Sequence, residues 1–191
     1  MGAVRGAGIE RPAQRQTNVR SSIWILLLAI SVAGCSAKYR VDSIEKPSAK
    51  LSPDTGFYVI LPADGSFEEQ TYEQSGTYVA EAIRVALLKH VRKAVIGSAR
   101  GGNLSSAMDH AKQAGLAYVF QPTILHWEDR ATEWSGITDK ITLKYQVIDV
   151  RSGSELSSTT ARASSKWGTF GGDHPQDLLP EPTKHFVDQL F

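Results

Sequence analysis

The apolar run from Ile23 to Ile30 sets the first limit on what this chain can become. Arg20 precedes the run, and Val32-Ala33-Gly34 follows it with small residues. A helix that spans a bilayer needs about 20 apolar residues, so this run is too short to cross one. A positive flank, a short apolar core and a small-residue exit are typical of a secretory signal peptide. We therefore expect residues 1–34 to be removed and the rest to fold outside the cytoplasm.

The end of this run, Val32-Ala33-Gly34-Cys35, resembles the bacterial lipobox, which a dedicated peptidase cleaves before the cysteine. The resemblance implies cleavage between Gly34 and Cys35, and a diacylglycerol and an N-acyl chain such as palmitate on Cys35. Stable anchoring takes about two lipid signals, so three acyl chains would hold the protein on a membrane. By the sorting rule of enterobacteria, Ser36 implies the periplasmic face of the outer membrane. The alternative is a free cysteine near an ordinary signal peptide.

Residues 1–19 lengthen the leader without any periodicity, which favours a start assigned too early, with Val19 as the initiator. Residues 1–34 hold four arginines and one glutamate, so their removal changes the formal net charge from +1 to −2. So small a charge does not indicate nucleic-acid binding. Cys35 is the only cysteine, which excludes an intrachain disulfide. We expect neither a cofactor nor a metal.

The mature chain divides into a polar part and a patterned part. Residues 35–55 are polar and show no sustained period, which predicts a lipidated cysteine followed by a flexible tether. Residues 56–191 have the length of one domain.

Strands and helices alternate in the first half of this domain. The pattern predicts a strand over 57–61, a helix that starts at Ser66 or Thr71 and runs to Val91, a strand over 94–97, a helix from Asn103 or Ser105 to Ala114, and a strand over 116–120. The two possible starts of the first helix both have the capping-box pattern. Short joints between such elements imply parallel pairing with right-handed crossovers.

The second half has a different pattern. Residues 123–129 continue as an extended segment, and 141–147 alternate apolar and polar side chains as a half-buried strand does. Asp149 to Gly153 predicts a hairpin turn, whose return arm is 154–167. Ala161 and Ala163 leave room for a C-terminal helix to pack closely. The fold class is therefore α/β (α+β), with one mixed sheet of about five strands: a parallel βαβαβ half, then an antiparallel hairpin, with helices packed on the sheet.

The densest polar cluster is His126-Trp127-Glu128-Asp129-Arg130, with Trp134 close behind. His126 and Glu128 share one face of a strand, which permits acid–base work, whereas Glu128 and Asp129 point to opposite faces. A closed metal site needs more ligands than this pair supplies. The other interpretation is a strand end that enters a charged loop, with Trp127 packed under the sheet.

Recognition is the further hypothesis for this cluster. Trp127, Trp134 and Arg130 are residue types that dominate binding hot spots, and aromatic rings also stack on sugars. Arg100-Gly101-Gly102-Asn103 precedes a helix, where backbone donors can hold an anion. Neither GxGxxG nor GK[ST] occurs there, and a plain strand-to-helix joint is the alternative.

Several of these stretches together resemble an uncharacterised family of Gram-negative lipoproteins, known only as a domain of unknown function. They are the lipobox, Tyr58-Val59-Ile60-Leu61-Pro62, the stretch from Trp127 to Gly136 and the turn from Asp149 to Gly153. The order of elements is also similar to the small α/β domains of periplasmic assembly lipoproteins. That resemblance implies binding of partners without chemistry.

We therefore expect an outer-membrane lipoprotein whose periplasmic domain binds a partner in envelope assembly or maintenance. The partner would be an envelope protein or peptidoglycan, and the expected binding residues are Trp127, Arg130 and Trp134. Two alternatives remain: a periplasmic hydrolase that uses His126 and Glu128, and a structural spacer.

Overall fold

The protein is described by a computed structural model that covers residues 2, 38–42, 44–45, 47, 49–129, 138–165 and 174–191. Residues 36–191 form one structural unit. Among the described residues, no helix combines the length and the apolar character that crossing a membrane requires.

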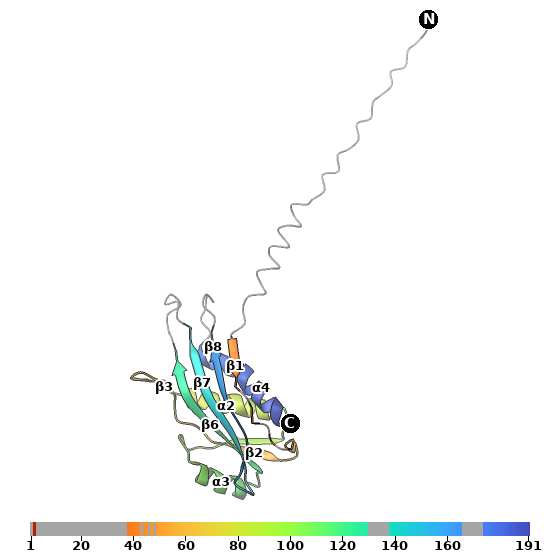
Figure 1. The fold of residues 1–191 in the computed structure, drawn as a ribbon, viewed down its shortest axis with the longest axis vertical. Coiled ribbons are helices and arrows are strands. Elements are labelled where there is room, and N and C mark those ends of the chain that lie inside the picture. Colours follow the sequence, from red (N-terminus) through yellow and green to blue (C-terminus); the bar gives the residue numbers. More distant parts are fainter. Residues whose placement is uncertain are drawn as a thin grey trace. The chain divides into compact units, whose positions relative to one another are not determined.

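The described elements form a main sheet, a small hairpin and a set of helices (Figure 1). In chain order they are β1 (Lys38–Val41), β2 (Gly56–Val59), β3 (Ser66–Phe67), β4 (Gln70–Thr71), α2 (Ser75–Leu87), β5 (Lys93–Ile96), α3 (Leu104–Gln113), β6 (Tyr118–Glu128), β7 (Lys140–Asp149), β8 (Glu155–Ser164), the 3₁₀ helix η1 (Pro175–Leu178) and α4 (Pro180–Leu190). The main sheet has the order β1-β8-β7-β6-β2-β5, and β3 pairs only with β4. A mixed α/β fold is confirmed, with six strands where about five were expected.

The parallel half of the sheet is confirmed. Strand β2 lies between β5 and β6 and runs parallel to both, because α2 and α3 each return the chain to the same end of the sheet. Asn103 caps α3 by accepting a hydrogen bond from the Ser106 amide at 2.8 Å. Gly115, at φ +65°, takes the left-handed conformation just past the end of α3.

The antiparallel half is longer than the sequence indicated. Residues 118–128 form one continuous strand, β6, which pairs with β7, and β7 pairs with β8 across the predicted hairpin. The hairpin turn ends at Gly153, whose φ of +73° favours glycine.

The sixth strand corrects the expectation of a flexible tether over residues 35–55. Lys38–Val41 pairs with β8 as strand β1, and Glu45 forms an isolated β-bridge with Ser158. Leu51 is buried, and its amide donates a hydrogen bond to the carbonyl oxygen of Leu190. The segment is polar because β1 is an edge strand whose side chains are mostly exposed. A strand of this kind shows no apolar alternation that would identify it.

The start of α2 is a second correction. Ser66 and Thr71, the two predicted helix starts, instead face each other in the β3–β4 hairpin. The helix begins at Ser75, after Gln74 at φ +72°. Its N-terminus is capped from a distance, since the Asp64 carboxylate accepts a hydrogen bond from the Gly76 amide at 2.8 Å. A residue so far upstream lies outside any local capping pattern.

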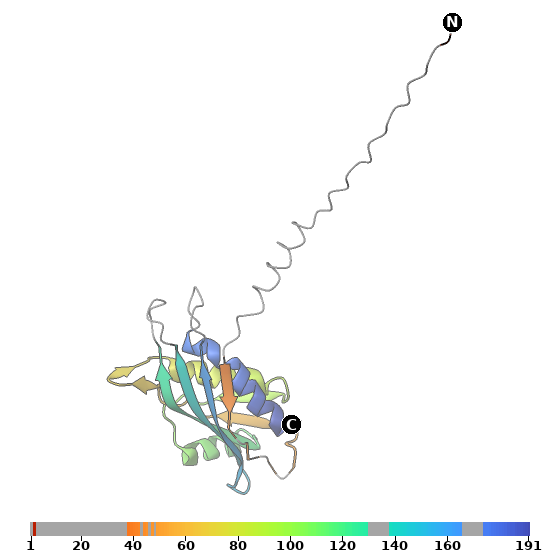
Figure 2. The same ribbon diagram turned by 45° about the horizontal axis from the view of Figure 1, so that its top comes forward.

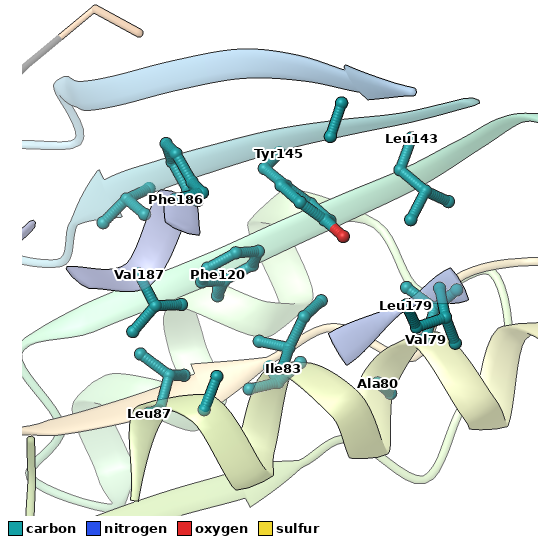
Figure 3. Close-up of a cluster of buried hydrophobic side chains, with 14 of the residues drawn as sticks. Val79, Ala80, Ile83, Leu87, Phe120, Leu143, Tyr145, Leu179, Phe186 and Val187 are labelled. Carbon is teal, nitrogen blue, oxygen red and sulfur yellow. The ribbon is translucent and has the colours of Figure 1, made fainter. Parts of the chain in front are cut away.

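The helices pack on both faces of the sheet. α2 and α4 cover one face over the main core, where Tyr145 of β7 lies close to Phe120, Phe186 and Ile83 (Figure 3). Ala161 and Ala163 of β8 are buried in this core, where small side chains were expected to admit the C-terminal helix. α3 packs against the opposite face over a smaller core that includes Val119 and Ile148.

Candidate binding surface

α3 packs against β2 and β6 at one end of its face of the sheet, and the other end has no helix over it among the described residues (Figure 1). Along β7 the residues Ile141, Leu143 and Tyr145 are buried in the main core, so Thr142 and Lys144 between them face the uncovered side. This surface is formed by β6, β7 and β8, which run side by side as long curved strands (Figures 1 and 2). We call this surface the open face.

The strand register places basic side chains next to one another on the open face. Arg40 of β1 is directly opposite Arg162 of β8, and Arg162 is in turn opposite Thr142 of β7. A second row lies two residues farther along each strand. It consists of Lys38 on β1, Ser164 on β8 and Lys140 on β7. Each row thus brings two cations together from strands that are distant in sequence.

These rows border a hollow of about 600 Å³, within the size range of small-ligand sites. Its lining residues are Lys38, Tyr39, Arg40, His126, Thr138, Lys140, Ile141, Thr142, Arg162, Ala163 and Ser164. Among the described residues no carboxylate lines it. Arg40, Lys140 and Arg162 expose 83%, 51% and 52% of their side chains, so a ligand can reach all three.

Asp42 is the carboxylate that lies nearest the two arginines in the part of the chain that the structure describes. It forms an ion pair with Arg162, and its other oxygen lies 3.7 Å from Nε of Arg40. Like charges directly opposite each other on paired strands destabilise a sheet, and one aspartate neutralises only one of these two arginines. The pair therefore keeps a net positive charge that an anion would offset.

A β-bulge shapes the end of β6 beside the hollow. Ile124 pairs with Leu143 and His126 with Thr142, so Leu125 is the extra residue. The bulge reverses the alternation, which turns Trp127 toward the main core, where its side chain is only 2% exposed. His126 lies at the rim of the hollow, with its ring 5.0 Å from that of Phe67.

His126 and Glu128 are brought together as the sequence suggested. The Nε2 atom of His126 lies 3.0 Å from a carboxylate oxygen of Glu128, and Nζ of Lys140 lies 3.7 Å from the same oxygen. Glu128 is 3% exposed. A buried carboxylate with two basic neighbours has its charge compensated, and this contact orients the His126 ring. No group of three or more metal-ligating side chains is present in the part of the chain that the structure describes.

The other predicted binding residues have different outcomes. Trp127 is packed under the sheet, which was the alternative interpretation of this residue. Arg130, Trp134 and the predicted cleavage site at Gly34 and Cys35 lie outside the described residues.

Arg100, in the loop before α3, is engaged by neighbouring side chains rather than held ready for an anion. Its guanidinium forms an ion pair with Asp64 and donates to the Thr77 hydroxyl at 3.1 Å. It thereby fastens the loop after β5 to the loop after β2. A second hollow of about 250 Å³ lies beside this loop and is lined by Tyr58 and His110, whose rings stack 5.9 Å apart.

A family model described as "Domain of unknown function (DUF4823)" matches residues 49–190, well over half of the chain. The chain belongs to this family. The predicted membership of a family known only as a domain of unknown function is thereby confirmed. A comparison with curated proteins gave no match.

The DUF4823 domain shares its fold with a solved bacterial protein. The PelC dodecamer from Paraburkholderia phytofirmans aligns with a TM-score of 0.63 and 13% identity, over 81% of this chain and 97% of PelC. Protein XCC0632 from Xanthomonas campestris aligns at 0.44 and 12%, over 76% and 90% of the two chains. The C-terminal domain of LpoB from Salmonella enterica aligns at 0.40 and 14%, over 61% and 85%. At these identities the similarity to PelC establishes fold alone, and the other two are loosely similar.

The open face of the DUF4823 domain was not predicted as a site. The alternation of Thr142 and Lys144 in the sequence marks the polar side of β7. The partner cations Lys38 and Arg40 fell within the expected tether, and only the pairing of β1 with β8 brings them to Arg162. Pairing between segments so distant in the chain leaves no local signal.

Proposed function

We propose that the protein is an outer-membrane lipoprotein, anchored through lipid on Cys35, whose periplasmic domain binds a partner in cell-envelope assembly or maintenance. The domain acts as an accessory without catalytic activity. Its binding surface is the open face, together with Arg130 and Trp134 in the segment that joins β6 to β7. The partner is an envelope protein or peptidoglycan.

One observation carries the binding role: the open face has a hollow of about 600 Å³ lined by basic side chains, with no helix over it among the described elements. Exposed sites of concentrated charge steer and select partners. The lipobox resemblance supports the anchor. Since PelC is described as a dodecamer, further copies of the chain are included among the candidate protein partners.

The anchor is tested by metabolic labelling with a palmitate analogue in cells that express the full chain. We expect label on the wild type and none on Cys35→Ser, which would move to the soluble periplasmic fraction. Ser36→Ala is the matched control and keeps the label. Density-gradient separation of the membranes would place the wild type with the outer membrane; recovery of unlabelled wild type in the periplasm would contradict the anchor.

The binding role is tested by crosslinking in living cells. Photoreactive residues replace Thr142 in the hollow and Trp134 in the segment between β6 and β7, and Val85 on α2, which is 54% exposed, serves as the control. We expect a discrete protein or peptidoglycan adduct from position 142 or 134 that position 85 does not give. Equal patterns from all three positions would contradict a binding surface here and favour the structural spacer.

A periplasmic hydrolase is the second candidate, because His126 and Glu128 form a 3.0 Å contact at the rim of the hollow. Screening the purified protein against ester, amide and glycoside substrates tests it. Activity that is lost in both His126→Ala and Glu128→Gln, with folding unchanged, would replace the accessory role with catalysis.

A further inference from the structure

We propose that the hollow of the open face binds an anionic polysaccharide, a chain of sugars that carry carboxylate groups. This inference rests on the proposed function, because such a polymer is met only if the domain faces the periplasm or cell surface. It names one chemical class of ligand for the surface and the residues that hold it: Arg40, Arg162, Lys140 and Lys38.

The charge of the hollow selects an anion. Four of the lining residues carry permanent positive charge. Two neighbouring carboxylates, Asp42 and Glu128, offset part of this charge, which leaves the hollow with a net positive charge. The mature chain has a formal net charge of −2, so the positive charge of the hollow differs in sign from that of the domain as a whole. An uneven distribution of this kind attracts an anionic partner to that face alone.

The arrangement of the cations selects a repeating anion. Neighbouring strands lie about 5 Å apart, so Arg40 and Arg162 form an adjacent pair, and Lys38 and Lys140, separated by β8, lie on strands about 10 Å apart. A single small anion would contact only part of this set. A polymer with a carboxylate on each sugar would meet the two rows in succession, and arginine binds carboxylates in a bidentate manner.

The uncharged lining residues fit a sugar better than a lipid or a nucleic acid. Thr138, Thr142 and Ser164 offer hydroxyls to a sugar. Ile141 and Ala163 are buried, so the described lining lacks the several exposed Trp, Phe or Leu side chains that insert into a membrane. A nucleic-acid site would be expected in a chain with a strongly basic balance.

The test uses the Cys35→Ser form of the chain, which carries no lipid anchor, in buffer without detergent, and measures binding by calorimetry. The probes are an alginate hexasaccharide as the carboxylated sugar, dextran as the neutral one, and vesicles with anionic phospholipid. We expect alginate to bind with an affinity that falls as salt rises, and dextran and vesicles not to bind.

Two kinds of variant locate the site. The triple variant Arg40→Gln, Lys140→Gln, Arg162→Gln is expected to bind alginate at least tenfold more weakly than the wild type. Its control is Lys89→Gln, Arg92→Gln, Lys112→Gln, which removes the same charge from exposed positions on other surfaces and is expected to lose less than twofold. Thr142→Trp fills the hollow without changing charge and is also expected to weaken binding.

The outcomes separate the two proposals. No alginate binding, equal losses in both triple variants, or vesicle binding in place of alginate would overturn the polysaccharide inference. If alginate did not bind but crosslinking from position 142 still captured a protein, the proposed accessory function would stand and only the polysaccharide inference would fail. If position 142 gave no specific adduct and Cys35 carried no lipid, the proposed function itself would fail.

Discussion

The phenol oxygen of Tyr145 and the hydroxyl oxygen of Thr183 lie 2.8 Å apart in the middle of the main core. Tyr145 belongs to β7 and Thr183 to α4, and both are fully or almost fully buried. This hydrogen bond joins the C-terminal helix to the sheet directly behind the open face. Burial also raises the pKa of Tyr145 far above its usual value, so the phenol stays neutral.

The first prediction concerns this pair. Tyr145→Phe leaves the buried Thr183 hydroxyl without this partner, which should lower the free energy of unfolding by about 1–3 kcal/mol. The double variant Tyr145→Phe, Thr183→Val removes both polar groups and should recover part of that loss. Urea denaturation of the wild type, the two single variants and the double variant measures the coupling; strictly additive losses would contradict it.

Gly65 is the subject of the second prediction. A Cβ atom at this position would lie 2.6 Å from Cβ of Trp127 and 2.7 Å from Cγ2 of Ile124, and the Gly65 amide donates a hydrogen bond to the Ser75 hydroxyl at 2.8 Å. Gly65→Ala should therefore destabilise the protein by about 1–3 kcal/mol through overpacking. The exposed neighbour change Ser66→Ala should alter stability by less than about 0.5 kcal/mol. Denaturant midpoints measure both variants, and a neutral Gly65→Ala would contradict this packing.

Trp127 is predicted to act on stability. Because its side chain is 2% exposed, Trp127→Ala should cost about 3–5 kcal/mol of folding free energy. Trp127→Phe retains most of the volume and should cost less. Thermal unfolding followed by circular dichroism makes the comparison. A folded Trp127→Ala of wild-type stability that had lost partner capture would restore this ring as a direct binding residue.

The acid sensitivity of the last helix gives the fourth prediction. The hydrogen bond from Lys184 lowers the pKa of Asp188, and the contact with His90 acts in the same direction. A carboxyl whose pKa is lower in the folded state adds stability above its unfolded pKa, and this stability is lost as the pH falls through the folded value. Asp188→Asn should therefore lose less stability than the wild type between about pH 5 and pH 2.

Urea unfolding at both pH values measures this difference. Asp109→Asn, an exposed carboxyl change on α3, is the control and should follow the wild type. An equal loss of unfolding free energy in the wild type and in Asp188→Asn would show that the Asp188 carboxyl does not contribute to the acid sensitivity of the protein.

The fold was largely predictable wherever local patterns decide structure. α3 was predictable from the helical spacing of its apolar residues, from the capping residue Asn103 and from Gly115 just past its end. β7 was predictable from the alternation of apolar and polar residues along 141–147. The start of α2 was not predictable, because its cap comes from Asp64, which pairs with Arg100 after β5. Long-range contacts of this kind have no signature within a short window.

The candidate site was less predictable for the same reason. The contact between His126 and Glu128 follows from their shared strand face, and it was expected. The bulge at Leu125, which directs Trp127 inward, has no marker such as glycine in the sequence. The cation rows depend on β1, whose four residues resemble any polar linker.

Strand β1 also decides where a fragment of this protein can begin. The family match starts at residue 49, and a chain cut there would leave one side of β8, ten residues long, with free amide and carbonyl groups. Exposed strand edges of that length pair with other chains, so such a fragment is expected to aggregate. A preparation that starts before Lys38 would stay soluble and would retain Lys38 and Arg40, so that all four cations of the hollow are present.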